Sequence, residues 1–179
     1  DGTIQIDSVE NQGTFIHVVI PFEIAEEPAV VQEMSELPKE NLSGCRILLA
    51  EDNELNREIA AFLLKDEGIS VTEAEDGQQA VECFLKMPEG YYDAVLMDIM
   101  MPVMDGYQAA RAIRGSGKKD AEMIPIIAIT ANAFAEDKRK TMEAGMNAHL
   151  SKPLNVPELM DTIRKFCDGK QMCQRPGKE

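Results

Sequence analysis

The sequence predicts an α/β fold: a doubly wound parallel sheet of five strands with helices on both faces, preceded by a short β-hairpin. Between residues 44 and 168, short apolar runs alternate five times with amphipathic stretches. Runs that are apolar throughout are typical of parallel strands, because helices cover both faces of such a sheet. The chain has 179 residues, of which 44% are hydrophobic and 28% charged, a composition typical of soluble globular proteins.

The predicted elements follow one another in a regular order. Strands are expected at residues 46–50, 69–73, 93–97, 124–129 and 148–150. The first helical stretch carries Ile59, Phe62 and Leu63 and ends before Gly68. Further helices are expected at residues 76–87, 107–114, 135–144 and 156–166. Five strand–helix repeats fit the flavodoxin-like strand order 2-1-3-4-5, in which ligands bind beyond the carboxyl ends of the strands.

A separate segment, residues 1–22, precedes this domain. Residues 3–7 alternate in polarity, residues 14–20 are rich in β-branched and apolar side chains, and a turn-forming cluster lies between them, so a hairpin is expected. Two strands alone are marginally stable in water. The segment is therefore predicted to be the end of a larger domain. Its apolar side chains should be exposed or contact another chain, rather than pack against residues 44–168.

The charge of the chain is unevenly distributed. The formal net charge is −14, and residues 23–43 are rich in glutamate and show no helix or strand period, which predicts an acidic linker. Residues 169–179 are polar and are expected to form a flexible tail. A chain this acidic, without a basic stripe, is a poor binder of nucleic acid, so we expect no nucleic-acid partner.

Two further features bear on location. No stretch approaches the roughly 20 apolar residues that span a bilayer, and the acidic start lacks the basic residues of a signal peptide. A cytoplasmic location without direct membrane contact is the resulting expectation. The four cysteines show no metal-ligand spacing and are expected to be reduced thiols.

Polar residues follow the predicted strands where each strand ends. Glu51 and Asp52 follow the first strand, Asp98 the third, Thr130 the fourth and Lys152 the fifth. The first and third strands are neighbours in the expected order, so three carboxylates should converge at one edge of the sheet. Like charges this close repel one another unless a cation lies among them, and oxygen ligands suit Mg²⁺. One alternative is that Asp52 or Asn53 simply caps the first helix.

This set of groups is suited to phosphoryl transfer. The transferred group carries charge on its equatorial oxygens, so catalysis consists largely of positioning and neutralisation by a metal ion and a lysine. Asp98 is the natural nucleophile, because carboxylates form aspartyl-phosphates. Lys152 supplies a fixed positive charge, and Thr130 supplies a hydroxyl.

Four motifs in order resemble a two-component receiver domain: Glu51-Asp52-Asn53, residues 97–106, residues 129–133 and Ser151-Lys152-Pro153. The resemblance implies that Asp98 is phosphorylated and that Lys152 pairs with the phosphoryl oxygens. It also implies that Thr130 is a switch hydroxyl acting on the face formed by the fourth helix, fifth strand and fifth helix.

The resemblance further implies how Mg²⁺ is bound and how the chain turns after the last strand. Asp52 would bind the ion directly together with Asp98, Glu51 mostly through water, and Met100 through its main-chain carbonyl. The Lys152–Pro153 peptide would be cis. His149 stands where many receivers have Tyr or Phe, so the usual aromatic switch is in doubt.

Residues 1–22 resemble the last two strands of a histidine-kinase ATP-binding domain. The matching residues are Gly2, Ile4, Ile6, Ser8, Gly13, Thr14, Phe15, Pro21 and Phe22. Together the two resemblances imply the C-terminal part of a hybrid sensor histidine kinase. Its phosphohistidine would be the donor, and a histidine-phosphotransfer protein would be the next acceptor. The segment carries no ATP site, so whether it counts as an enzyme is left open.

Three other functions are compatible with part of this pattern. A free-standing response regulator with a fortuitous hairpin would act by protein–protein contact. A haloacid-dehalogenase-like phosphatase would share the aspartyl-phosphate chemistry, but Asp98 lacks the D-x-D-x-T/V pattern of that family. A DNA-binding regulator is disfavoured because no output domain follows residue 168.

Overall fold

The computed structural model describes residues 2–9, 13–21, 42–131 and 135–167, with the side chains of 135–138 excepted. The chain divides into two compact units, residues 1–39 and 40–179. The predicted acidic linker, the predicted tail, and Asn132 and Ala133 of the third motif lie outside the described residues, apart from the end of the linker at 42–43.

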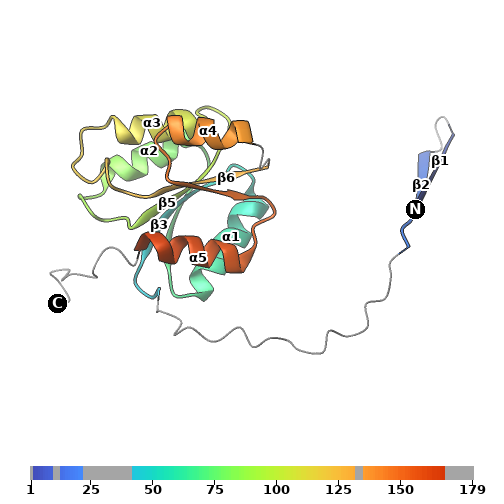
Figure 1. Cartoon of the computed structure of the whole chain (residues 1–179), viewed down its shortest axis with the longest axis horizontal. Coiled ribbons are helices and arrows are strands. Elements are labelled where there is room, and N and C mark those ends of the chain that lie inside the picture. Colours follow the sequence, from blue (N-terminus) through green and yellow to red (C-terminus); the bar gives the residue numbers. More distant parts are fainter. Residues whose placement is uncertain (1, 10–12, 22–41, 132–134, 168–179) are drawn as a thin grey trace. The chain divides into compact units, whose positions relative to one another are not determined.

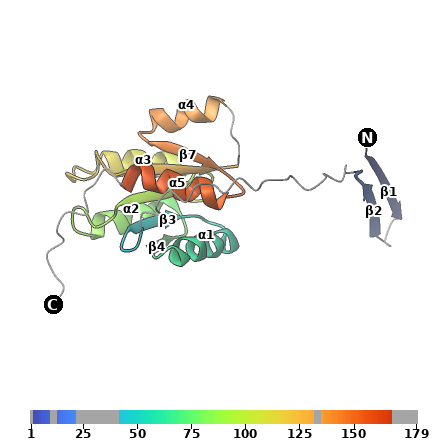
Figure 2. The ribbon, with the colours of Figure 1, turned by 60° about the horizontal axis from the view of Figure 1, so that its bottom comes forward.

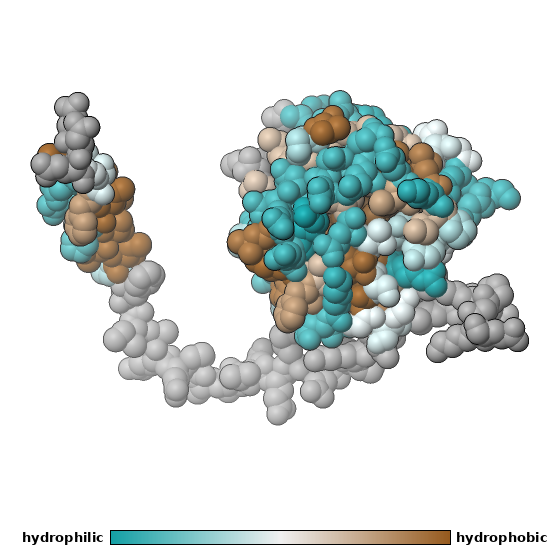
Figure 3. Space-filling view, turned by 180° about the vertical axis from the view of Figure 1, so that it is seen from behind, coloured by the Kyte–Doolittle hydropathy of each residue, from teal (hydrophilic) through white to brown (hydrophobic). Residues whose placement is uncertain are grey.

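The first unit contains the predicted hairpin. Strands β1 (Thr3–Val9) and β2 (Gly13–Val19) pair antiparallel, with Ile4 opposite Val18 and Ile6 opposite Ile16. Alternate residues of a strand point to the same side, so these four apolar side chains share one face. Every residue of both strands is exposed, and hydrophobic side chains cover much of the hairpin surface (Figure 3). The predicted exposure of apolar side chains in this segment is confirmed for Ile4, Ile6, Phe15, Val18 and Ile20.

The second unit is built on a five-stranded parallel sheet. Its strands are β3 (Arg46–Ala50), β4 (Ser70–Ala74), β5 (Ala94–Asp98), β6 (Ile126–Thr130) and β7 (Ala148–Ser151). They lie in the order β4-β3-β5-β6-β7, which confirms the predicted order 2-1-3-4-5 (Figure 1). Strands β5 and β6 are buried along their whole length, as expected of apolar runs at the centre of a covered sheet.

Five helices cover the two faces of the sheet (Figures 1 and 2). They are α1 (Glu54–Asp66), α2 (Gly77–Lys86), α3 (Gly106–Arg114), α4 (Ala135–Glu143) and α5 (Val156–Cys167). Helices α1 and α5 lie on one face, and α2, α3 and α4 lie on the other. Successive residues of β5 contribute to different cores: Leu96 packs on the α1–α5 side and Met97 on the α2–α3 side.

Side-chain caps fix where four helices begin. Asn53, Asp76, Asp105 and Asn155 accept hydrogen bonds from the main-chain N–H three residues later, at 3.0, 2.8, 2.7 and 3.1 Å. Such caps contribute about 1 kcal/mol each. Because Asn53 caps α1, the neighbouring Asp52 carboxylate is not used as the cap.

Helix α1 differs from the expectation drawn from its apolar residues. The side chains that face the sheet are Ala60, Ala61 and Leu64. Three other large apolar side chains lie outward instead, on a surface we call the α1 stripe: Leu55, Ile59 and Phe62, which are 65%, 50% and 68% exposed. Residues spaced by four and three positions lie on one side of a helix, so these three form a continuous apolar strip.

Other boundaries differ in detail. Strands β4 and β5 lie one residue later than predicted, and β6 begins at Ile126 rather than at residue 124. Leu42 is only 4% exposed and packs in the α1–α5 core, although it falls within the predicted linker. Within the described part of the chain, no helix has the length and hydropathy needed to cross a bilayer. Three of the four cysteines are described: Cys45 is buried, and Cys83 and Cys167 are half-buried.

Candidate functional site

The three predicted carboxylates meet at one edge of the sheet. Glu51 follows β3, Asp52 begins the turn to α1, and Asp98 is the last residue of β5. One oxygen from each lies within 4.8 Å of the others. Glu51 and Asp98 are buried, at 3% and 2% exposure, whereas Asp52 is exposed. The site therefore has two carboxylates held inside the protein and one that is open to solvent.

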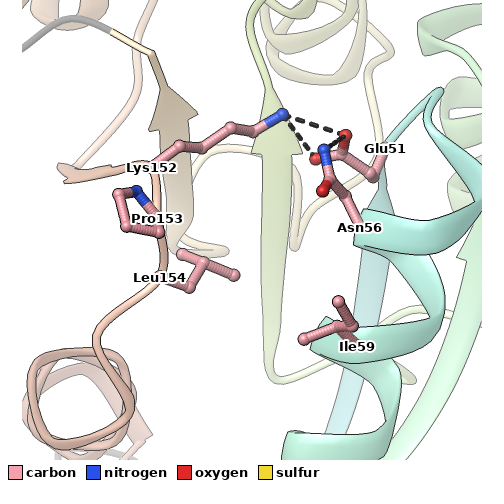
Figure 4. Close-up of a pocket in the computed structure, with 6 residues that line it drawn as sticks. All are labelled: Glu51, Asn56, Ile59, Lys152, Pro153 and Leu154. Carbon is pink, nitrogen blue, oxygen red and sulfur yellow. Dashed lines mark hydrogen bonds and ion pairs between the residues drawn. The ribbon is translucent and has the colours of Figure 1, made fainter. Parts of the chain in front are cut away.

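Lys152 lies between the two buried carboxylates. Its Nζ is 2.7 Å from Asp98 Oδ2 and 2.7 Å from Glu51 Oε2 (Figure 4, which draws the Glu51 contact). Burial alone would lower the pKa of Lys152, but its hydrogen bonds to Asp98 and Glu51 and their negative charges outweigh this, so the pKa is raised. The Lys152–Pro153 peptide is cis, as predicted.

The loop after β5 orients the Asp98 carboxylate. The main-chain N–H of Met100 donates to Asp98 Oδ1 at 3.2 Å, while Lys152 donates to Oδ2. Gly106 closes the loop by donating its N–H to the carbonyl of Ile99 at 3.0 Å. A Cβ at position 106 would collide with the main-chain oxygen of Asp98. The predicted role of the Met100 carbonyl as a metal ligand remains a prediction.

Thr130 and Lys152 enter the same edge from neighbouring strands. Thr130 ends β6 and is buried, and the main-chain N–H of Lys152 donates to the Thr130 carbonyl at 2.8 Å. The structure thus brings together Glu51, Asp52, Asp98, Thr130 and Lys152, all of which the sequence had singled out. His149 is half-buried on β7, three positions before the lysine.

Two site residues were missed by the sequence reasoning. Asn56 Nδ2 donates to Glu51 Oε1 at 3.1 Å, and Arg57 Nη1 donates to the main-chain carbonyl of Glu51 at 2.9 Å. Both lie in the first turns of α1. A possible signal was their position one helical turn after a capping residue, where side chains can reach back toward the preceding loop.

A pocket of about 170 Å³ adjoins the lysine bridge (Figure 4). It lies between α1 and the segment that follows β7. Its lining residues are Glu51, Asn56, Ile59, Lys152, Pro153 and Leu154. One end is therefore charged and continuous with the carboxylate site, and the other is apolar and includes Ile59 of the α1 stripe.

The donor set suits a hard divalent cation. The candidate ligands are carboxylate oxygens, they lie close enough to share one ion, and the exposure of Asp52 leaves room for water. These are the properties that Mg²⁺ requires. Three carboxylates facing one ammonium also leave a negative excess that a cation would reduce.

Known proteins resemble this chain over most of its length. The family model for the response regulator receiver domain matches residues 47–164. Hybrid signal transduction histidine kinase L of Dictyostelium discoideum is 34% identical over 167 residues, which is 93% of this chain and 10% of that protein. The aerobic respiration control sensor protein ArcB of Escherichia coli is 36% identical over 168 residues, 93% of this chain and 21% of that protein. The chain thus spans a small part of these relatives.

Solved structures resemble the second unit in fold. The receiver domain of sensor histidine kinase PA1611 from Pseudomonas aeruginosa, crystallised with a magnesium ion in its active site cleft, is 40% identical. The match has a TM-score of 0.64 and covers 70% of this chain and 99% of that domain. A second similar structure is the complex of the histidine phosphotransfer protein Ypd1 with the receiver domain of Ssk1, both from Saccharomyces cerevisiae. The match has 31% identity and a TM-score of 0.64, and it covers 72% of this chain and 93% of the matched chain.

Three findings lead to the same assignment: the parallel sheet topology, the carboxylates bridged by Lys152, and the family match over most of the second unit. The chain belongs to the response regulator receiver domain family of two-component signalling.

Proposed function

We propose that this domain accepts a phosphoryl group on Asp98, in the presence of Mg²⁺, from a phosphohistidine of a partner protein. The observation that carries the proposal is the convergence of Glu51, Asp52 and Asp98 within 4.8 Å, with Lys152 Nζ 2.7 Å from Asp98. The site thus combines a nucleophile, a cation-binding set and a fixed positive charge, which phosphoryl transfer needs.

In the transfer step, an oxygen of Asp98 forms a bond to phosphorus as the phosphorus–nitrogen bond of the donor histidine breaks. The imidazole leaves with that electron pair. Asp52, Asp98 and the Met100 carbonyl would hold Mg²⁺ directly and Glu51 would hold it through water. The ion would neutralise charge on the phosphoryl oxygens. Lys152 would neutralise the same oxygens from the other side.

After transfer, Thr130 would turn its hydroxyl toward the new phosphoryl group. Thr130 ends β6, and its carbonyl is hydrogen-bonded to Lys152 at the end of β7, so a shift at Thr130 is mechanically tied to that strand. The α4–β7–α5 face is the element we propose to be switched, through a local contact that biases a two-state surface. The group would then pass to a histidine-phosphotransfer protein or act through that face.

Phosphorylation of Asp98 is the first test. Acetyl phosphate with Mg²⁺ is expected to add one phosphoryl group per chain, mapped to Asp98 by mass spectrometry, because Asp98 is the only buried carboxylate among the three that has both a lysine and a main-chain N–H on its oxygens. Asp98→Asn is expected to abolish the label, and a chelator to suppress it. Asp66→Asn, an exposed change at the end of α1, is the control and should keep the label. Label persisting in Asp98→Asn would refute the proposal.

We also propose that residues 1–22 are the end of a histidine-kinase ATP-binding domain and that the receiver belongs to a hybrid kinase. The similarity to hybrid histidine kinase L and to the sensor protein ArcB supports this. Each match covers 93% of the chain, so each must extend beyond the receiver into the hairpin and the linker. Any kinase activity would belong to the longer protein.

Truncation tests where the receiver begins. Removing residues 1–39 is expected to leave thermal unfolding and Asp98 labelling nearly unchanged, since all of the described hairpin is exposed. Removing residues 1–43 also takes Leu42 out of the core, and burial of one leucine contributes about 2 kcal/mol. We therefore expect only the longer truncation to lower the free energy of unfolding. If removal of residues 1–39 abolished cooperative thermal unfolding, the hairpin would be part of the receiver fold.

The α1 stripe is the surface we propose for the phosphohistidine partner. Asp98 is almost fully buried, so a donor histidine must reach it from the mouth of the site, and the pocket connects that mouth to Ile59. An apolar strip on a helix suits packing against another helix. The similar Ssk1 receiver, solved with Ypd1, supports a partner of this class.

Substitution of Phe62 can separate binding of the partner protein from phosphorylation of Asp98. Phe62→Ser is expected to slow phosphoryl transfer from phosphorylated Ypd1 about tenfold, the effect of a contact worth roughly 1.4 kcal/mol. Labelling by acetyl phosphate should not change, because Phe62 is 68% exposed and lies outside the carboxylate site. Leu85→Ser, a partly exposed leucine on α2 of the opposite face, is the control. Equal transfer rates in the two variants would contradict the proposed surface.

A further inference from the structure

Arg57 of α1 reaches back under the loop that carries the acidic pair. Its side chain is only 11% exposed. Nη1 donates to the main-chain carbonyl of Glu51 at 2.9 Å and lies 3.5 Å from the carbonyl of Asp52. One guanidinium therefore contacts both residues that present a carboxylate from this loop.

The charge of Arg57 is balanced by groups outside the site. Glu73 Oε2 and Glu75 Oε1, at the end of β4, lie 3.8 and 3.7 Å from the guanidinium nitrogens. Glu73 is closer to another cation, since Lys65 Nζ lies 3.0 Å from its Oε1. The shortest contact that Arg57 makes is thus with a backbone carbonyl, which indicates a geometric rather than a mainly ionic role.

Backbone restraint in this loop bears directly on the carboxylates. The N–H of Glu51 donates to the Ala74 carbonyl at 3.1 Å, and Arg57 holds the carbonyl of the same residue. The Glu51 side chain is held in addition by Asn56 and Lys152, whereas Asp52 is exposed. A metal ion binds more tightly when outer groups already hold its ligands in place.

We propose that Arg57 is a positioning residue that fixes the β3–α1 loop so that Glu51 and Asp52 face Asp98, and thereby raises the affinity for Mg²⁺. This rests on the proposed function. Two effects oppose each other: a positive charge near the site repels the ion, while an ordered loop favours it. Glu73 and Glu75 offset part of the charge, and the shortest contact of the guanidinium is with a backbone carbonyl, so we take the geometric effect to be the larger.

The test is the Mg²⁺ affinity of the unphosphorylated protein, measured by isothermal titration calorimetry. Arg57→Met is expected to weaken binding about tenfold, the usual effect of removing a group that orients metal ligands. Arg57→Lys keeps the charge but replaces the planar guanidinium with a compact ammonium on a flexible stem. Its Mg²⁺ affinity should therefore fall between those of the parent and Arg57→Met. Lys65→Met is the matched control: it removes one positive charge from the same helix and the closest partner of Glu73, yet touches neither carbonyl. Its affinity should stay within about twofold of the parent.

Each other outcome has a definite meaning. Tighter binding in Arg57→Met would show that charge repulsion dominates, and unchanged binding would show that the loop needs no such restraint; either overturns the inference. Equal losses in Arg57→Met and Lys65→Met would show that the effect does not depend on the contacts with the two carbonyls and would also overturn it. If Arg57→Met does not fold, Arg57→Lys decides, since an affinity equal to that of the parent would show that the guanidinium geometry is not needed and would overturn the inference. A parent that binds no Mg²⁺, or binds it equally as Asp52→Asn, would refute the proposed function instead.

Discussion

Replacement of Lys152 by Met is expected to lower the free energy of unfolding by about 3 kcal/mol in Mg²⁺-free buffer at neutral pH, the lower end of the cost of removing one partner of a buried ion pair. Glu51 and Asp98 would then lie close together in the interior without the ammonium that is now 2.7 Å from each. The lower end applies because the Lys152 side chain is 25% exposed, so solvent screens part of the interaction.

The pH dependence of this difference follows from the raised pKa of Lys152. A group whose pKa is higher in the folded state contributes its full stabilisation below the unfolded pKa, which for lysine is 10.5. The contribution is lost as pH rises through the folded pKa. The difference in unfolding free energy between the parent and Lys152→Met should therefore be constant near neutrality and, on the alkaline side, shrink above pH 10.5.

Denaturant unfolding monitored by circular dichroism provides the measurement. Millimolar Mg²⁺ should stabilise Lys152→Met more than the parent, because in the parent the lysine already neutralises the same carboxylates. Lys65→Met, which removes an exposed ion pair with Glu73, should change stability by less than about 1 kcal/mol. A Lys152→Met protein as stable as this control would show that the bridge adds nothing to the fold.

Replacement of Gly106 by Ala is the second change with a large expected effect. The added methyl group would overlap the main-chain oxygen of Asp98 and lie 3.0 Å from Ile99 Cα, both of them backbone atoms that cannot rotate away. Overpacking of this kind costs about 1–3 kcal/mol. Relief requires a shift of the end of β5, so we expect both a lower unfolding free energy and a slower acetyl phosphate reaction.

Gly115 provides the matched control at the other end of α3. It has φ of −83°, which any residue adopts, and a Cβ there would meet only the Arg111 carbonyl, at 3.2 Å. Gly115→Ala should therefore stay within about 0.5 kcal/mol of the parent and keep its labelling rate. Unfolding and labelling of the two variants are compared side by side. If Gly106→Ala had the same stability and the same labelling rate as Gly115→Ala, the close approach of Gly106 to the Asp98 backbone would be unimportant for folding and phosphorylation.

Much of the fold and site could be predicted because the signals are local. Each buried strand is a short apolar run, and each functional side chain comes directly after one, so the order of strands was enough to bring Glu51, Asp98 and Lys152 together. The predicted strand limits differ from the observed ones by one or two residues, because the apolar runs and the hydrogen-bonded ladder do not begin and end at the same residues. Pro125, which has no N–H to donate, lies just before β6 in this structure.

The parts that sequence did not reveal depend on distant contacts. In α1, two arcs of the helix are apolar, and the structure turns the arc with Ala60 and Ala61 toward the sheet, leaving Phe62 outward. Small side chains allow a close approach of helix to sheet, a preference that hydrophobicity alone does not encode. From the sequence alone, Arg57 is indistinguishable from an ordinary exposed residue of α1, because its contacts with the β3–α1 loop depend on the folded chain. Leu42 is a single apolar residue, which carries no period.

The lysine bridge joins residues that are 101 positions apart in the chain, and Lys152 follows Asp98 by 54. During synthesis at roughly 5–20 residues per second, the acceptor aspartate would therefore be made about 3–11 s before the lysine that completes its site. In that interval β7 is missing, and at first β6 as well, so the sheet is incomplete. Under the proposed function, a nascent chain would be unable to take up the signal until nearly the whole domain has left the ribosome. Competence to receive the phosphoryl group would thus act as a check that the domain has been made to its last strand.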